Sequence, residues 1–343
     1  MSTLTLANRS NLFDVQKLKA PNGGAVEVTN TLIERNDLLM DLPALPANGG
    51  MFVTGARTSS LPTSTLTNIG GVWGSSKSER TPFVEALATT RGRFQCPKDV
   101  LETEGPEVSQ MLVSEEKDDH IESMGQEWSN LVISGPDEQA AAVQNSIVGL
   151  ANRAPYKTID NEYTYDTGGV GSNLRSAWLM QPGARGVHLA YNPNHPTLGV
   201  QMTEKGEVFV QDPTAASLDA AEGRWDIIIE FMLQQGFVIR DQRAVKRIAN
   251  IPVGGTVTPG ADLINNVIRA ANKHSSTMSK TWFLYCDADV HTQLILGAND
   301  TLKVYMSDKN IYQTDLPMIG TNIIVRRLDS LNHAVDSGET QIV

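Results

Sequence analysis

The sequence has few cysteines, a deficit of positive charge and no long apolar run. Its two cysteines, Cys96 and Cys286, are far apart and lack the spacing of metal ligands. They indicate neither a disulfide framework nor a zinc site, and they favour folding in a reducing cytoplasm. Residues 1–11 lack the basic and apolar regions of a signal peptide, and no apolar run reaches about 18 residues. We expect neither a secretion signal nor a membrane-spanning segment.

The charge balance argues against a protein that grips nucleic acid. The 28 Lys and Arg residues are outnumbered by 39 Asp and Glu residues, which gives a formal net charge of -11. Binding through phosphate contacts requires the opposite sign. The acidic balance is compatible with a protein that encloses DNA without gripping it. A lining that held phosphates would hinder the sliding of DNA inward and outward.

Large apolar residues are scarce in the first part of the chain, although hydrophobic residues make up 40% of the whole. Residues 1–48 are polar and broken by Pro and Gly, with one short helical pattern over 28–39, and they predict an arm that lies on another surface. Residues 50–92 are rich in Thr, Ser and Gly and have too few apolar residues for a core. They predict an extended hairpin that projects onto a neighbouring molecule.

The rest of the chain predicts an α+β fold. An acidic helix is expected over 114–135, with Ser114 as its N-cap. Its apolar stripe consists of Ile121, Met124, Trp128, Leu131 and Val132. Short strands with antiparallel pairing are predicted at 177–180, 186–191, 207–211, 225–233, 236–240 and 244–248. A helix at 260–273, a buried strand at 282–286, a second helix to about 297, and strands at 302–306 and 322–327 follow.

Two carboxylates after an apolar run form the strongest enzyme-like motif. Asp287 and Asp289 follow the predicted strand 282–286, and such a pair can hold magnesium and supply a phosphoryl-accepting aspartate. The motif resembles the first motif of haloacid-dehalogenase-type phosphotransferases, but too few residues follow it to build the rest of that site. We therefore expect Asp287 to cap the next helix and Asp289 to lie in its first turn.

Other motifs favour structural interpretations. The glycine-rich segment 168–172 lacks the ending of a phosphate-binding loop and precedes a strand, so it predicts a turn. The six histidines form no i, i+4 pair of metal ligands. The basic residues Arg240, Arg243, Lys246 and Arg247 predict a solvated or subunit-contacting face. No catalytic, cofactor-binding or metal-binding residue is predicted.

Several short motifs, each weak alone, occur in a fixed order between residues 61 and 251. They are Leu61-Pro62, Asn68, Gly70-Gly71, Trp73, Ser76-Lys77-Ser78, Gly149-Leu150-Ala151, Arg153, Tyr156, Gly168-Gly169, Gly171-Ser172, Trp178, Gly186-Val187-His188, Gly236-Phe237, Arg240-Asp241 and the run from Arg247 to Ile251. In this order the chain resembles the major capsid proteins of short-tailed bacteriophages, whose shell fold is shared by tailed phages and the floor of herpesvirus capsids. The position of Trp73 after the double glycine and the C-terminal third depart from the pattern.

The resemblance implies a division of the chain into four parts. These are an N-terminal arm (1–48), an extended loop (49–100), a peripheral domain with the long spine helix (101–165 and 203–250) and an axial domain (166–202 and 251–343). The long strands precede the pair of helices, which is similar to a branch of the family with permuted strand order.

The resemblance also implies a function without enzymatic activity or cofactor. The chain is expected to assemble in the bacterial cytoplasm into hexamers and pentamers of an icosahedral virion, around double-stranded DNA that it encloses without sequence-specific binding. Scaffolding, portal and cement proteins are further expected partners. Some family members crosslink the loop lysine to a neighbour's asparagine, but we expect non-covalent contacts here. Two alternatives stay open: the shell of a bacterial nanocompartment, and a metal-dependent phosphohydrolase that uses Asp287 and Asp289.

Overall fold

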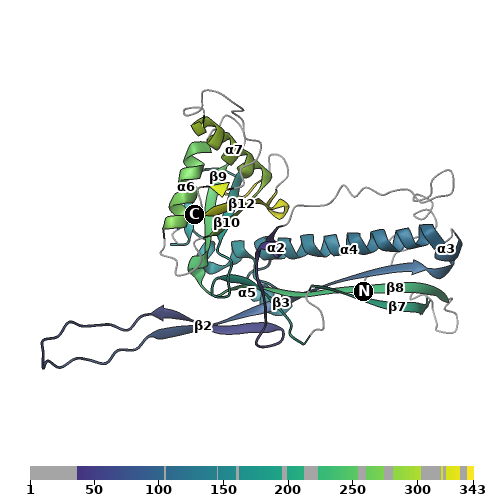
Figure 1. Ribbon diagram of the computed structural model, residues 1–343, viewed down its shortest axis with the longest axis horizontal. Helices are drawn as coiled ribbons and strands as arrows, with labels where there is room; N and C mark the ends of the chain where they lie inside the picture. Colours follow the sequence, from purple (N-terminus) through teal and green to yellow (C-terminus); the bar gives the residue numbers. More distant parts are fainter. Residues whose placement is uncertain are drawn as a thin grey trace. The chain divides into compact units, whose positions relative to one another are not determined.

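The computed structural model (Figure 1) describes most of the chain beyond the first 36 residues. The described ranges are 37–103, 106–144, 146–159, 162–194, 199–211, 223–253, 260–273, 281–302, 318–319, 322–332 and 338–343. Most of the predicted arm and nearly all of the strand predicted at 302–306 lie outside these ranges.

The chain divides into two compact units, which we describe separately. The described parts of the first unit come from Thr89–Trp128 and Pro196–Gln234, and the second comprises Glu34–Ala88, Ser129–His195 and Gln235–Val343. Three long elements continue from one unit into the other, namely β3 (Glu79–Pro97), α4 (Pro106–Ser134) and β8 (Gly223–Ile239).

Two sheets of six strands each organise the described residues. The first has the order β1-β6-β8-β3-β2, with β7 paired to β8; its other strands are β1 (Ala44–Pro46), β2 (Phe52–Ser60), β6 (Val187–Tyr191) and β7 (Val200–Gln211). The second has the order β11-β12-β10-β5-β9-β4. Its strands are β4 (Thr164–Asp166), β5 (Leu174–Met180), β9 (Val245–Pro252), β10 (Trp282–Cys286), β11 (Met318–Ile319) and β12 (Ile323–Arg327).

Among the described residues, the helices are fewer than the strands and mostly short. The α-helices besides α4 are α2 (Leu38–Asp41), α3 (Lys98–Thr103), α5 (Glu138–Gln144), α6 (Gly260–Asn272) and α7 (Ala288–Leu302). The short 3-10 helices are η2 (Leu150–Asn152), η3 (Ala154–Tyr156), η5 (Gln242–Ala244) and η6 (Asp329–Leu331). This mixture confirms the predicted α+β class.

The main core of the second unit lies between the second sheet and the pair α6 and α7. Leu263, Val267 and Ala270 recur at helical spacing on α6 and are buried in one cluster with Leu179 of β5 and Leu284 of β10. Strand β5 is buried at every position, and its last four residues, 177–180, are all apolar in place of the alternation of a half-exposed strand.

The long helix α4 begins earlier than the sequence pattern indicates. It starts at Pro106, two turns before Ser114, so the prediction of Ser114 as the N-cap is wrong. Proline suits the first turn of a helix because no intrahelical partner is needed for its missing N–H. Ile121, which was predicted in the buried stripe, is exposed, whereas Met124, Trp128 and Val132 are buried as expected.

Strand β8 is continuous where the sequence predicts two strands separated near Gly236. Gly236 lies opposite Ala190 of β6 in the ladder, and a Cβ atom there would lie 3.1 Å from the backbone oxygen of Ala86 on β3. The glycine therefore allows two strands to approach closely and does not mark a turn.

Strand β7 in the first unit pairs with β8, and its other edge has no partner among the described strands. Its middle residues, including Glu204, Lys205 and Glu207, are exposed. A bulge interrupts the pairing between Glu204 and Gly206, where Gly206 has a φ of 69°. Ion pairs of 2.9 Å from Lys117 to Glu204 and 2.8 Å from Lys98 to Glu207 join this strand to the helices of the same unit.

The predicted basic surface is only half correct. Arg240 and Arg243 are exposed, but Lys246 and Arg247 on β9 are buried. The Lys246 Nζ donates a hydrogen bond to the Ala270 carbonyl at 2.7 Å, near the C-terminal end of α6, where the helix dipole favours a cation. Burial lowers the pKa of Lys246 to about 8.

Arg247 ties the C-terminal segment to the second sheet. Its guanidinium donates to the Glu339 carboxylate at 2.8 Å and to the Ser176 hydroxyl at 3.1 Å. The backbone groups of Glu339 and Leu174 bond reciprocally. The C-terminal segment thereby provides the counter-charge for a buried arginine.

We predict that Glu339→Ala destabilises the isolated chain by about 2 kcal/mol, because a buried guanidinium loses its charged acceptor. Urea unfolding measures the loss. Gln341→Ala is the matched control, since that side chain is exposed in the same segment. Equal stability of the two variants would show that Arg247 does not depend on Glu339.

Candidate functional site

An antiparallel hairpin, formed by β2 and β3, is the first part of the candidate site. The two strands pair from Phe52 opposite Ala86 to Ser60 opposite Glu79. Beyond these residues, 61–78 belong to no strand, and we call this segment the tip. The hairpin extends away from α5 and the second sheet within its unit (Figure 1). The predicted long hairpin is therefore confirmed.

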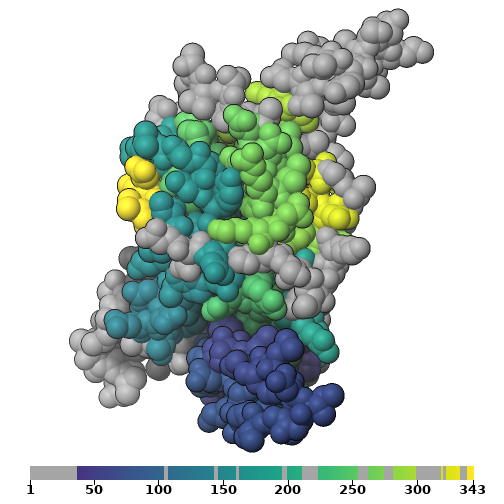
Figure 2. All heavy atoms as spheres, turned by 90° about the vertical axis from the view of Figure 1, so that its left-hand side faces the viewer, coloured from purple at the N-terminus to yellow at the C-terminus, as the bar shows by residue number. Residues whose placement is uncertain are grey.

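The tip carries apolar side chains that nothing in the described chain covers. Five large ones are exposed, namely Leu61 (82%), Leu66 (106%), Ile69 (108%), Val72 (97%) and Trp73 (74%). Figure 2 looks at the end of the hairpin, in purple and blue, with no other described segment in front of it. A cluster of this kind marks an interaction surface, since burying each such side chain contributes roughly 1.5–3 kcal/mol.

The backbone of the tip is also poorly paired. The Gly71 amide donates to the Asn68 carbonyl at 2.9 Å, and Gly70 supplies the φ of 86° that this turn requires. The Ser76 hydroxyl donates to the Thr63 carbonyl at 2.8 Å. The tip forms no ladder with another described segment, so most of its N–H and C=O groups are available to a partner.

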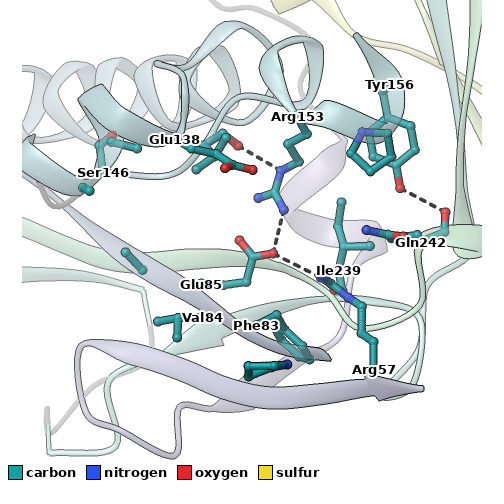
Figure 3. A pocket seen from close by; sticks show the side chains of 16 residues that line it. Arg57, Phe83, Val84, Glu85, Glu138, Ser146, Arg153, Tyr156, Ile239 and Gln242 are labelled. Atoms are coloured by element: carbon teal, nitrogen blue, oxygen red, sulfur yellow. Dashed lines mark hydrogen bonds and ion pairs between the residues drawn. The ribbon is translucent and has the colours of Figure 1, made fainter. Parts of the chain in front are cut away.

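A buried ion-pair cluster lies at the base of the hairpin (Figure 3). Glu85 of β3 lies between Arg153, 2.7 Å away, and Arg57 of β2, 3.5 Å away. Arg57 also donates to the backbone carbonyls of Ile239 and Arg240 and stacks on the Phe83 ring at 4.2 Å. These contacts fix the base of the hairpin to the body of its unit.

A cavity of about 480 Å³ opens beside this cluster. Its lining is mainly apolar and comes from β3, α5, the segment 146–156 and the end of β8; it includes Pro82, Phe83, Val84, Ala141, Ala142, Val148 and Pro155. The Nη2 of Arg153, which also lines the cavity, is buried and has no hydrogen-bond partner among the described residues. The cavity therefore contains one unsatisfied donor.

Sequence reasoning assigned no role to Arg57, Glu85 or Arg153. Arg153 appeared only as one of the residues in the resemblance. The one available signal was Glu85 itself, because it is a lone carboxylate in the otherwise uncharged run Phe83–Leu87. Such a residue on a buried strand needs a paired cation.

The structure gives Asp287 and Asp289 the structural roles predicted for them. The Asp287 carboxylate accepts from the Val290 amide at 2.7 Å, which caps α7. Arg175 pairs with Asp287 at 2.8 Å and with Asp289 at 3.2 Å. Because a buried arginine already pairs with both carboxylates, the pair is not arranged to hold a divalent cation.

The glycine-rich segment and the two cysteines singled out in the sequence also lie in ordinary structural positions. Gly168 and Gly171 have φ values of 82° and 111° in the predicted turn before β5. Cys96 and Cys286 are buried and form no disulfide. Within the described ranges, no group of three His, Cys, Asp or Glu side chains could hold a metal ion, and no described helix has the length and apolar character to cross a membrane.

A comparison with models of protein families gives a match over most of the chain. The model of the family described as major capsid protein GP7 matches residues 20–337. The chain belongs to this family of major capsid proteins. Membership decides between the open alternatives in favour of a phage shell subunit. Among curated proteins, no sequence matches the capsid protein.

Solved structures show that the capsid protein has the tailed-phage shell fold. A chain from the cryo-EM structure of bacteriophage Epsilon15 matches it with a TM-score of 0.76 and 18% identity over 99% of both chains. The capsid of bacteriophage JBD30 matches with a TM-score of 0.51 and 10% identity, over 89% of this chain and 94% of that one. Its family makes the capsid protein a shell-forming component of the virion and implies a structural role.

We predict that Asp287→Ala destabilises the capsid protein by about 3 kcal/mol, because it removes the cap of α7 and leaves Arg175 without its nearest counter-charge. Asp289→Ala is the control, since this half-exposed carboxylate forms a weaker pair worth less than about 1 kcal/mol. Urea unfolding compares the two. Equal losses would contradict the assigned roles.

A second prediction concerns His188, which is buried on β6. Burial, with a smaller effect of Arg240, lowers its pKa from 6.5 to about 4. Between these pH values the unfolded chain binds a proton that the folded chain does not, so stability falls as pH falls from 6.5 to 4. His188→Leu is expected to flatten this part of the stability curve, measured by urea unfolding at several pH values; parallel curves would contradict it.

Proposed function

We propose that the tip makes a principal contact between neighbouring capsid proteins and joins them into hexamers and pentamers. The observation that carries this proposal is the exposure of five large apolar side chains on an otherwise polar hairpin. A second copy of the chain is the occupant that suits a shell-forming family. Unpaired backbone groups in the tip add hydrogen bonds once a neighbour covers them.

The size of the apolar contribution suits reversible assembly. Five side chains at roughly 1.5–3 kcal/mol each give a gross gain on the order of 10 kcal/mol. Association of two proteins costs an estimated 4–15 kcal/mol. One tip contact therefore gives a weak pair, whereas a closed ring, in which every subunit both gives and receives a tip, is stable.

The wider assembly is part of the same proposal. The rings would form an icosahedral head around double-stranded DNA in the bacterial cytoplasm, with scaffolding, portal and cement proteins as further partners. The net charge of -11 supports a container that encloses DNA without gripping its phosphates. We also propose the four-part division at residues 48, 100, 165, 202 and 250 as the arm, loop, peripheral and axial regions.

We predict that Ile69→Asp lowers the yield of closed shells at least tenfold, because it places a charge in a contact that must become dry. Thr65→Asp is the matched control, since it adds the same charge at an exposed polar position of the tip. Negative-stain microscopy with light scattering counts the shells. Normal shells from Ile69→Asp, or from a chain without residues 61–78, would refute the proposal.

A further inference from the structure

We infer that the tip of one capsid protein docks in the cavity at the hairpin base of the next copy. This inference rests on the proposed function and adds the receiving surface. Donor and receiver are different surfaces of the same chain, so the contact is head-to-tail. Repetition of a head-to-tail contact closes into a ring when the rotation between copies permits it.

The cavity has the size and lining for an apolar side chain. Its volume of about 480 Å³ lies within the range of about 300–1,000 Å³ typical of pockets that enclose small molecules. Phe83, Pro155 and the exposed side chain of Val84 form apolar parts of the wall. The largest exposed side chain of the tip is Trp73, and a cavity of this volume has room for its indole ring.

The donor without a partner in the cavity, Arg153 Nη2, can be paired by a backbone carbonyl of the tip. Arg153 Nη2 is buried without a partner among the described residues, while its Nη1 is held by Glu85. A buried donor left without an acceptor costs stability. The tip has no carboxylate but has backbone carbonyls outside any ladder, and one of these would satisfy Nη2 on docking.

Charge complementarity supports the same pairing. Lys77 is the only charged residue of the tip, and it pairs with no described residue. The cavity is lined by two arginines and by Glu85, which pairs with both, and also by Glu138. Glu138 is exposed and forms no ion pair with a described residue, so it is the acceptor left for an incoming Lys77.

The tip does not occupy the cavity of its own chain, since its apolar side chains are exposed. Arg57 lines the cavity, and Gly70 in the tip is 13 residues further along (70 minus 57). Extended chain spans at most about 3.5 Å per residue, so the tip can lie up to about 45 Å away. The hairpin extends away from α5 (Figure 1), and the contact therefore requires a second copy at a comparable spacing.

Disulfide trapping tests the docking site directly. Gly74→Cys and Ala142→Cys are introduced into one chain; Gly74 has open space for a side chain, Ala142 is an exposed residue of the cavity wall, and the native cysteines are buried. Assembled particles oxidised and run on a non-reducing gel are expected to give a ladder up to pentamers and hexamers. Gly74→Cys with Val170→Cys, an exposed site elsewhere, is the control without a ladder.

The result that overturns the inference is an absence of crosslinks in normal shells, or a ladder that stops at dimers, which is the mark of a two-fold contact.

Charge exchange gives an independent measurement. Lys77→Glu and Glu138→Lys are each expected to lower the shell yield at least threefold, and the double variant is expected to restore it. If Ile69→Asp blocks assembly while exchange gives no rescue, the tip contact stands but the cavity is not its receiver.

Discussion

Exposed apolar side chains and backbone groups outside any ladder are both stabilised when a partner covers and pairs them, and the tip concentrates both in one segment. A single chain cannot cover these groups itself, because strands β2 and β3 hold the tip away from the rest of their unit. The base is fixed by Arg57, Glu85 and Arg153, so the hairpin presents its tip from an anchored position. The second unit thus holds the exposed apolar tip at a position where another copy of the chain can cover it.

The body that carries the hairpin depends on a few buried charges, each with a counterpart. Arg175 pairs with Asp287, Arg247 pairs with Glu339, and Lys246 donates hydrogen bonds to carbonyls at the end of α6. Such pairs gain little net stability over apolar packing, but an unpaired member is very costly. They therefore specify where α7, α6 and the C-terminal segment must sit against the second sheet.

Local composition and pattern were enough to predict the hairpin, the strand Trp282–Cys286 and the cap formed by Asp287. They failed where a distant partner decides the outcome. Arg247 resembles a surface residue until Glu339, 92 positions away, is folded against it. Gly236 resembles a turn residue because the close approach of β3 is not visible in sequence. The cavity was missed for the same reason, since its wall is assembled from five separate segments of the chain.

The outer edge of β7, which no described strand covers, has a consequence for a chain that assembles with copies of itself. An exposed strand edge is a template on which any other strand can add, and such growth has no defined end. On β7 the bulge at Gly206 and the charged residues Glu204, Lys205 and Glu207 make this addition unfavourable. Polymerisation by random sheet extension is suppressed along this edge, so a crowded pool of subunits stays available for ordered growth.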